Sequence, residues 1–210
     1  VITVTSGREA NPVVTEGNLS IATFNVLNYF NGEVTDSGEV TFDYDANRGA
    51  EDETEFALQE GRIVEAIVGL NADVVGLMEI ENDGFGDDSA IQALVTAINA
   101  ELAEEEQYTF VSTADSSIIG TDAITVGLLY RASVVVPAGD AQIVDMPIQQ
   151  IDEDSVAQMR AALVQTFTHV ESEKTFAVAV NHFKSKGSEC AEDLAEDVSD
   201  TDVIQGSCNA

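Results

Sequence analysis

The sequence predicts an α/β fold in which a β-sheet is covered on both faces. In the first half of the chain, two segments with the apolar spacing of amphipathic helices alternate with short apolar runs. The second half is almost entirely strand-like. Its last strand, residues 174–180, is apolar on both sides, as is typical of a strand buried on both faces. We therefore expect helices on one face of a sheet and a second layer on the other.

The first half follows a clear order of elements. We expect a buried strand, a long loop, a helix, a second strand and a second helix, at residues 19–30, 31–52, 54–70, 73–82 and 89–103. Thr54 is available as the N-cap of the first helix. The second helix opens with Ser89 and Gln92 at the spacing of a capping box. The loop is long enough to be functional rather than a simple connector.

The second half predicts six strands, the last two joined as a hairpin by the turn "ESE". These strands are residues 108–112, 123–130, 133–136, 141–144, 162–170 and 174–180. At the other end of the chain, residues 1–18 lack sustained periodicity, so we interpret them as a linker or a terminal strand leading in from an upstream region.

The charge balance is strongly acidic. The chain has 8 basic and 39 acidic residues, a formal net charge of −31, and 44% hydrophobic residues, so it predicts a folded protein with an acidic surface. Such a surface repels nucleic acid at low ionic strength and much less in brine, where the Debye length falls to about 3 Å at 1 M salt. A halophilic or marine source is one interpretation, and an ordinary acidic protein is the other.

Several features favour an exported protein. No apolar run approaches the roughly 20 residues that a membrane span needs. The sequence begins with neither an initiator Met nor a signal-peptide core, which is expected of a mature or excised chain. Cys190 and Cys208 flank an acidic segment, and we expect a disulfide between them, with two free thiols as the alternative. We therefore predict that the protein is secreted.

Polar residues that could carry chemistry follow three apolar strands. Asn25 follows one, Glu79 follows the next, and Asn181 and His182 follow the last. Loops at the ends of a rigid sheet are where catalytic groups gather, so these residues predict one converging site. A solvated Glu79 and a structural His182 are the simpler alternatives. The other histidine, His169, precedes a turn and is expected at the surface.

At these positions the chain resembles a known family. "ATFNVLNYF", "ADVVGLMEIEN", "GTDAITVGLLYR", "MRAALVQTF" and "VNHFKSKGS" are similar to successive motifs of the endonuclease/exonuclease/phosphatase superfamily. "RGAEDETEF", "EIENDG" and "QGSCN" resemble the secreted bacterial nucleases in particular. The resemblance covers residues 19–210. It implies part of a four-layer α/β sandwich, with two β-sheets packed face to face and the helices outside.

The resemblance also implies roles for the converging residues. Glu79 corresponds to the metal-ligand glutamate, which takes Mg²⁺, with Ca²⁺ or Mn²⁺ as alternatives. Asn25 corresponds to the asparagine that orients the metal and phosphate, and His182 to the histidine that serves the leaving oxygen. Asp122 is the candidate for the carboxylate that holds His182 in the right tautomer.

Further residues are expected on the substrate side. Arg160 and Tyr130 resemble substrate-side residues, with the Arg160 guanidinium in contact with phosphate, and Asn181 lies beside the histidine. Lys184 and Lys186 are two of the three lysines in the chain. On so acidic a protein, we interpret their place after the histidine as cations kept for a polyanion, although pairing with neighbouring carboxylates would also explain them.

The second half of the family pattern is missing from these 210 residues. A later Asp-x-Asn motif and a final Asp-His pair do not occur. We therefore expect residues 19–210 to be an incomplete domain whose natural partner is the missing C-terminal half. The function predicted is metal-dependent hydrolysis of a phosphodiester, with nucleic acid as the substrate. A lipid or inositol phosphodiester, and a non-catalytic acidic or calcium-binding module, remain the alternatives.

Overall fold

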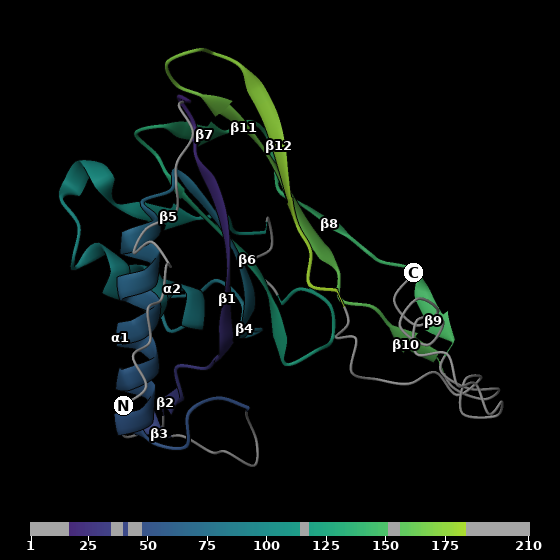
Figure 1. The fold of residues 1–210 in the computed structure, drawn as a ribbon. Helices are drawn as coiled ribbons and strands as arrows, with labels where there is room; N and C mark the ends of the chain where they lie inside the picture. Colours follow the sequence, from purple (N-terminus) through teal and green to yellow (C-terminus); the bar gives the residue numbers. More distant parts are fainter. Residues whose placement is uncertain (1–16, 35–39, 42–47, 114–117, 151–155, 184–210) are drawn as a thin grey trace, which may run out of the picture.

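The computed structural model describes residues 17–34, 40–41, 48–113, 118–150 and 156–183 (Figure 1). Two of the predicted substrate residues, Lys184 and Lys186, lie outside the described residues. The same holds for the predicted disulfide of Cys190 and Cys208, and for residues 1–16 of the predicted linker.

The first sheet has four strands, which run in the order β1, β4, β6, β5. Their bounds are Ile21–Tyr29, Val74–Glu81, Ile124–Arg131 and Tyr108–Phe110. β1 pairs with β4 in parallel, whereas β6 is antiparallel to both β4 and β5. The sequence predicted all four strands, because each is a short apolar run bounded by Gly, Asn, Asp or Ser.

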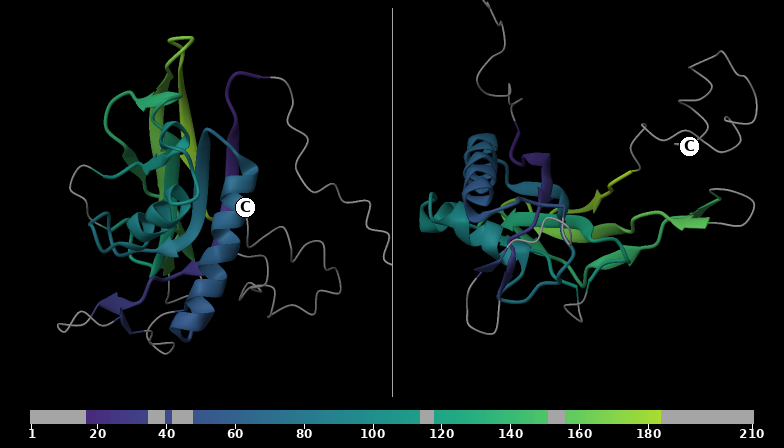
Figure 2. Two further views of the ribbon diagram at one scale, coloured as in Figure 1. Left: turned by 90° about the vertical axis from the view of Figure 1, so that its left-hand side faces the viewer. Right: turned by 90° about the horizontal axis from the view of Figure 1, so that it is seen from below.

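Two α-helices cover one face of this sheet (Figure 2). α1 (Glu53–Leu70) is capped by Asp52, whose carboxylate accepts from the Glu55 amide at 2.8 Å. The expected cap, Thr54, lies inside the first turn, so that prediction was wrong by two residues. α2 (Ala90–Asn99) is capped by Ser89 as predicted. A short 3-10 helix, η1 (Glu104–Glu106), leads from α2 towards β5.

The core between the helices and the first sheet is mostly aliphatic. Its fully buried members come from α1, α2, β1, β4 and β6, and include Ile67, Leu94, Val26, Leu77 and Leu129. Leucine, isoleucine and valine at helical spacing on one side meet alternating residues of the strands on the other. This packing makes the first sheet a rigid base from which the strand ends project.

A second sheet covers the other face. It has the order β12 (Thr175–Val180), β11 (Ala162–His169) and β7 (Val135–Pro137), and β8 (Gln142–Val144) pairs with the first part of β11. Phe167 and Val180 of this sheet are buried together with Val74 and Leu128 of the first. The two sheets therefore pack face to face, with the helices outside, as the α/β prediction required.

One expectation about β12 was wrong. Phe176, Val178 and Val180 face the first sheet, but Ala177 and Ala179 are exposed on the opposite side of the strand. Nothing in the described part of the chain covers this outer side, so β12 is buried on one face only. The sequence suggested a covered strand because alanine was counted as an apolar residue. Alanine is small, however, so its exposure carries little hydrophobic cost.

Two small ribbons lie in regions that were not assigned strands. β2 (Glu33–Val34) pairs with β3 (Val40–Thr41), and β9 (Ile148–Gln150) pairs with β10 (Val156–Gln158). The first ribbon lies within the predicted loop of residues 31–52. Among the described residues, neither helix is both long and apolar enough to cross a membrane.

Candidate active site

Glu79 is placed by a β-bulge near the end of β4. Met78 pairs with Val126 and Ile80 pairs with Thr125, so Glu79 is one extra residue in β4 with no partner in β6. Its φ is +65°, in the left-handed region that residues other than glycine rarely adopt. Strain of this kind gathers at functional sites.

The bulge decides which face of the sheet receives the carboxylate. Val75 and Leu77 point towards the helices, and strict alternation would send residue 79 the same way. Because of the extra residue, Ile80 takes that place in the helix-facing core instead. The Glu79 side chain therefore points towards the second sheet, where it is 19% exposed beside the end of β12.

Asn25 on the neighbouring strand holds this carboxylate. Its Nδ2 donates to Glu79 Oε1 at 2.8 Å, and its Oδ1 accepts from the Leu27 amide at 2.8 Å. β1 is irregular at the same level, because Leu27 and Asn28 have φ of +59° and +52° and the pairing with β4 shifts between Asn25 and Tyr29. The irregular parts of β1 and β4 thus lie side by side.

His182 completes the group from the second sheet. It follows β12, and its Nε2 lies 3.4 Å from Glu79 Oε1. The ring is 14% exposed, and its Nδ1 is buried without a hydrogen-bond partner among the described residues. Burial lowers the pKa of His182 and the charge of Arg160 lowers it further, while Glu79 and Asp122 act in the opposite direction. The neutral imidazole is therefore favoured.

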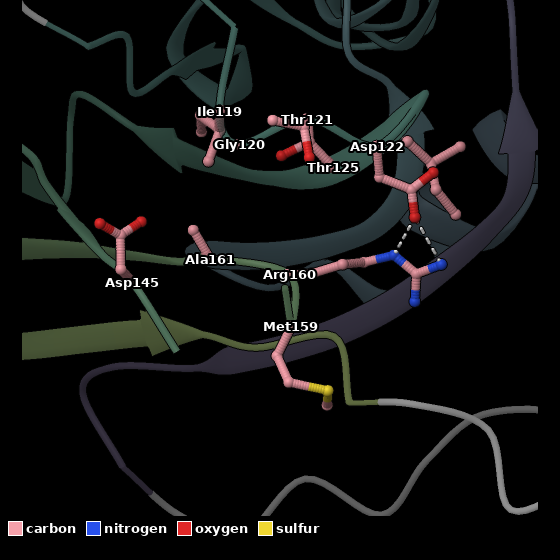
Figure 3. Close-up of a pocket in the computed structure, with 10 residues that line it drawn as sticks. Ile119, Gly120, Thr121, Asp122, Thr125, Asp145, Met159, Arg160 and Ala161 are labelled. Carbon is pink, nitrogen blue, oxygen red and sulfur yellow. Dashed lines mark hydrogen bonds and ion pairs between the residues drawn. The ribbon is translucent and has the colours of Figure 1, made fainter. Parts of the chain in front are cut away.

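Asp122 has different partners from those expected. Its Oδ2 accepts from Arg160 Nε and lies 2.8 Å from Arg160 Nη2 (Figure 3), and its Oδ1 lies 3.4 Å from Arg48 Nη2. The predicted hydrogen bond from His182 to Asp122 is absent, because two guanidinium groups occupy the carboxylate. A forked guanidinium matches a carboxylate better than an imidazole does. Asp122 acts here as an anchor for Arg160.

Arg160 and Asp122 line a small pocket between the start of β6 and the end of the loop before β11 (Figure 3). Its cavity volume of about 30 Å³ has room for a water or two and not for a nucleotide. Any phosphodiester bound by Arg160 therefore lies across the open surface of the strand ends. Arg160 itself remains 25% exposed towards that surface.

The structure does not bring Tyr130 to this group, so its substrate-side role stays a prediction. Glu81 pairs with Ile124 and Val74 pairs with Tyr130, which places Tyr130 at the opposite end of β6. Tyr130 is five positions further along the strand than Thr125, a distance of about 17 Å. Tyr130 packs against Phe167 and lines a separate pocket of about 320 Å³. The strand positions were predicted correctly, but the antiparallel direction of β6 was not considered.

The remaining predicted residues differ in their surroundings. Asn181 lies next to His182, and its amide donates to the Ala179 carbonyl at 3.4 Å. The expectation that His169 lies at the surface was wrong, because it is only 5% exposed. His169 Nδ1 lies 2.8 Å from Ser172 Oγ and accepts from the Ser172 amide, so this histidine closes the hairpin turn.

The acidic segment after β4 is tied into the fold. Asp83 accepts from the Ala90 amide at 2.8 Å at the start of α2, and burial raises the pKa of this carboxyl. The Asn82 amide donates to the carbonyls of Ile119 and Asp122. Both side chains therefore stabilise the loop structure.

Glu79 is the described carboxylate best placed to hold a metal. Its contacts with Asn25 and His182 both use Oε1, and Oε2 takes part in neither. Among the described residues, no group of three or more histidine, cysteine, aspartate or glutamate side chains is close enough to hold an ion. Mg²⁺ usually keeps several waters and uses one or two carboxylates together with substrate phosphate. The donors present here therefore fit a cation that is held mainly by water and substrate phosphate. They do not form a site in which protein groups supply all the ligands.

Comparison with known proteins gave matches among solved structures only. No family model matches the sequence, and no curated protein matches it. An Enterococcus faecalis V583 protein of unknown function is 16% identical, with a TM-score of 0.46, over 81% of this chain and 54% of its own. Humanised D. rerio TDP2 is 20% identical, with a TM-score of 0.44, over 80% of this chain and 48% of its own.

A third structure is described as an endonuclease/exonuclease/phosphatase family protein from Bacteroides thetaiotaomicron. It is 12% identical, with a TM-score of 0.44, over 77% of this chain and 49% of its own. The chain therefore spans about half the length of the solved structures that it matches.

Proposed function

We propose that this chain carries part of the active site of a metal-dependent phosphodiesterase of the endonuclease/exonuclease/phosphatase class, with nucleic acid as its substrate. The observation that carries the proposal is the convergence of Asn25, Glu79 and His182, from three strands of two sheets, where β1 and β4 have strained backbone. A strained backbone, a carboxylate and a partly buried imidazole with an unused nitrogen are features of a reaction centre rather than of a packed interior. The sequence motifs at the same three positions support the same class.

Each described residue has a role that follows from its surroundings. Arg160 is fixed through Nε and Nη2 by Asp122, which leaves Nη1 for a phosphate oxygen. His182 is held neutral by burial, so one of its nitrogens carries a hydrogen that a phosphate oxygen or the leaving oxygen accepts. Asn25 orients Glu79 and keeps Oε1 occupied.

Mg²⁺ would be held by Glu79 Oε2 together with waters and the substrate phosphate, and when bound it neutralises charge on the phosphate oxygens. The residues of this chain then position the phosphate between Arg160 and His182. The base that activates the attacking water is not among the residues to which we assign a role. We propose that it comes from the C-terminal half of the same domain.

The decisive experiment is cleavage of supercoiled plasmid in the presence of Mg²⁺. It compares the natural full-length chain with its Glu79→Gln and His182→Ala variants, with Gln92→Leu on α2 as a control far from the strand ends. We expect cleavage by the parent chain and by Gln92→Leu, and a loss of about 10²- to 10⁴-fold in the other two. Equal cleavage by all four proteins would overturn the assignment of the site.

The same assay tests the substrate class and the fragment. If the natural chain cuts no plasmid but hydrolyses a lipid or inositol phosphodiester, nucleic acid is the wrong substrate. If it hydrolyses neither, the phosphodiesterase proposal fails. Cleavage by residues 1–210 alone would show that these residues already contain the base.

We further propose that the protein is secreted by a halophilic microbe. The support is the net charge of −31, which opposes the approach of a polyanion at low salt and is screened at high salt. We expect plasmid cleavage to rise from millimolar towards molar salt, opposite to the usual loss through counterion release. Activity that falls steadily as salt is added would contradict the halophilic interpretation.

A further inference from the structure

A glutamine on helix α1 is bonded to the irregular part of β1. Gln59 Nε2 donates to the Val26 carbonyl at 3.1 Å and to the Leu27 carbonyl at 2.7 Å. One side-chain amide thus uses its two hydrogens on two consecutive carbonyls. These carbonyls belong to the part of β1 that leaves regular pairing with β4.

The bonded segment is the one that places Asn25. The Leu27 amide donates to Asn25 Oδ1, and the other end of that side-chain amide, Nδ2, donates to Glu79 Oε1. A continuous series of hydrogen bonds therefore runs from Gln59 through Leu27 and Asn25 to the carboxylate. The orientation of the Asn25 amide depends on the direction of the Leu27 N–H.

That direction depends on an unfavourable backbone conformation. Leu27 and Asn28 both have positive φ, although neither is a glycine, and Leu27 has a bulky side chain that is 71% exposed. The Leu27 side chain therefore gives the turn little packing against the core. A strained conformation persists only when surrounding contacts hold it, and the Gln59 amide supplies two of them.

We propose that Gln59 is a positioning residue, which holds the strained turn at Leu27 and so fixes the Asn25 amide against Glu79. The inference rests on the proposed function for its catalytic consequence, but not for its structural part. Gln59 touches neither Glu79 nor His182 in the described hydrogen bonds. It acts entirely through the backbone of β1.

The attachment of α1 to β1 does not depend on this amide. Glu60, the next residue of the helix, accepts from the Tyr29 hydroxyl at 2.6 Å, and the Tyr29 ring packs against Phe56 with centroids 5.3 Å apart. Ile63 and Ile67 are buried against the sheet as well. A Gln59 variant therefore keeps the helix in place, which separates a positioning role from a folding role.

The structural part is tested by amide hydrogen exchange on the 210-residue chain. Gln59→Leu keeps the approximate size and removes both donors, whereas Gln59→Lys keeps a donor group that reaches the same carbonyls. The matched control is Gln92→Leu, because the side-chain amide of Gln92 donates to Thr96 within α2 and, in the described hydrogen bonds, makes no contact with β1. We expect the Leu27 amide to exchange about ten-fold faster in Gln59→Leu, and at the parent rate in Gln92→Leu and Gln59→Lys. An unchanged rate in Gln59→Leu would overturn the proposal.

The catalytic consequence is tested with the natural full-length chain, Mg²⁺ and bis(p-nitrophenyl) phosphate as a small phosphodiester. We expect Gln59→Leu to lower kcat by about ten- to a hundred-fold, with KM and the melting temperature close to those of the parent, because a misplaced group slows the reaction more than it weakens binding. Gln59→Lys should recover most of kcat.

The outcomes separate this inference from the proposed function. Faster exchange at Leu27 with an unchanged kcat would overturn the positioning role and leave the proposed function intact. A fall in kcat that Gln59→Lys does not recover, or that follows the melting temperature, would show a merely structural role. A parent chain that hydrolyses no phosphodiester would refute the proposed function and with it the catalytic consequence, while the exchange rate would still decide whether Gln59 holds the turn.

Discussion

The two ends of the paired sheets hold their polar groups in different ways. At the end where β4 reaches Glu79, which we call the site end, three non-glycine residues with positive φ lie within strands. At the opposite end, which we call the distal end, Asn71 and Glu173 also have positive φ. Those two lie in a helix cap and a hairpin turn, where left-handed residues are ordinary. Among the described residues, non-glycine residues with positive φ inside a sheet strand lie at the site end only.

The two histidines of the chain show the same difference. His169 at the distal end is buried, and its Nδ1 is bonded to Ser172. His182 at the site end is partly buried, with 14% of its side chain exposed, and its buried Nδ1 has no partner among the described residues. A buried polar group without a partner costs free energy, and the other such side-chain atom in the described part of the chain is Arg131 Nε at the distal end. Burial alone therefore does not separate a structural histidine from a reactive one.

The largest expected effect is on activity and separates the two histidines. In the natural full-length chain, His182→Ala should lower phosphodiester cleavage by about 10²- to 10⁴-fold, while His169→Ala should leave kcat close to that of the parent at a temperature where both are folded. Initial rates on plasmid with Mg²⁺ measure this. Equal losses in the two variants would remove the distinction between the ends.

The next effect is on stability and uses two arginines. Arg131 at the distal end is 7% exposed, donates to Asn71 Oδ1 and lies over the Tyr108 ring at 4.9 Å. Arg131→Ala should cost about 2 to 3 kcal/mol, because a buried charged hydrogen bond and a cation–π contact are lost together. Arg160→Ala should cost less than about 1 kcal/mol. Urea unfolding of the 210-residue chain gives both values, and the reverse order would contradict the assigned roles.

A third variant tests whether the interface between the sheets transmits changes to the site. A Cβ at Gly76 would lie 3.0 Å from Val180 Cγ2, and Val180 precedes His182 by two residues. Gly76→Ala should therefore cost about 1 to 3 kcal/mol through overpacking, and lower kcat by displacing the end of β12. Gly61→Ala is the control, since nothing lies within 4 Å of a Cβ there and alanine favours the helix. Unfolding and initial rates of both variants decide the matter.

The smallest effect concerns pH. Burial lowers the pKa of His182 in the folded chain below its ordinary value of about 6.5, so the unfolded chain binds this proton more tightly. The corresponding stability is fully present above the unfolded value and is lost as the pH falls through the folded value. We expect the unfolding free energy of the parent, relative to His182→Gln, to decline below neutral pH. A difference that stays constant with pH would show that burial does not shift this group.

Much of the fold could be predicted from local patterns. A regular spacing of apolar residues marks β1, both helices and the β11–β12 hairpin, and the same apolar residues form the packed core. Asn25 and Glu79 were expected to follow their strands but lie inside β1 and β4, whereas His182 follows β12 as expected. What failed was the relative direction of strands, as with Tyr130, since periodicity says nothing about which way a neighbour runs.

The contacts within the site depend on which of several possible partners each side chain binds, and the sequence does not show this. Asp122 was expected to hold His182, but Arg160 and Arg48 take its oxygens. The bulge at Glu79 was not expected either, because "LMEIE" has no glycine or proline to mark it. A small sign existed in the pattern: Leu77 and Ile80 are three apart, which breaks the alternation of a regular strand.

The left-handed backbone of Glu79 implies a trade between stability and function. A non-glycine residue in this region costs of the order of 1 kcal/mol that a glycine would not. Glu79→Gly is thus a substitution that relieves the fold while removing the carboxylate. A search for more stable variants of this protein would therefore tend to select Glu79→Gly and lose the activity. Selection for activity instead keeps Glu79, and with it a less stable β4.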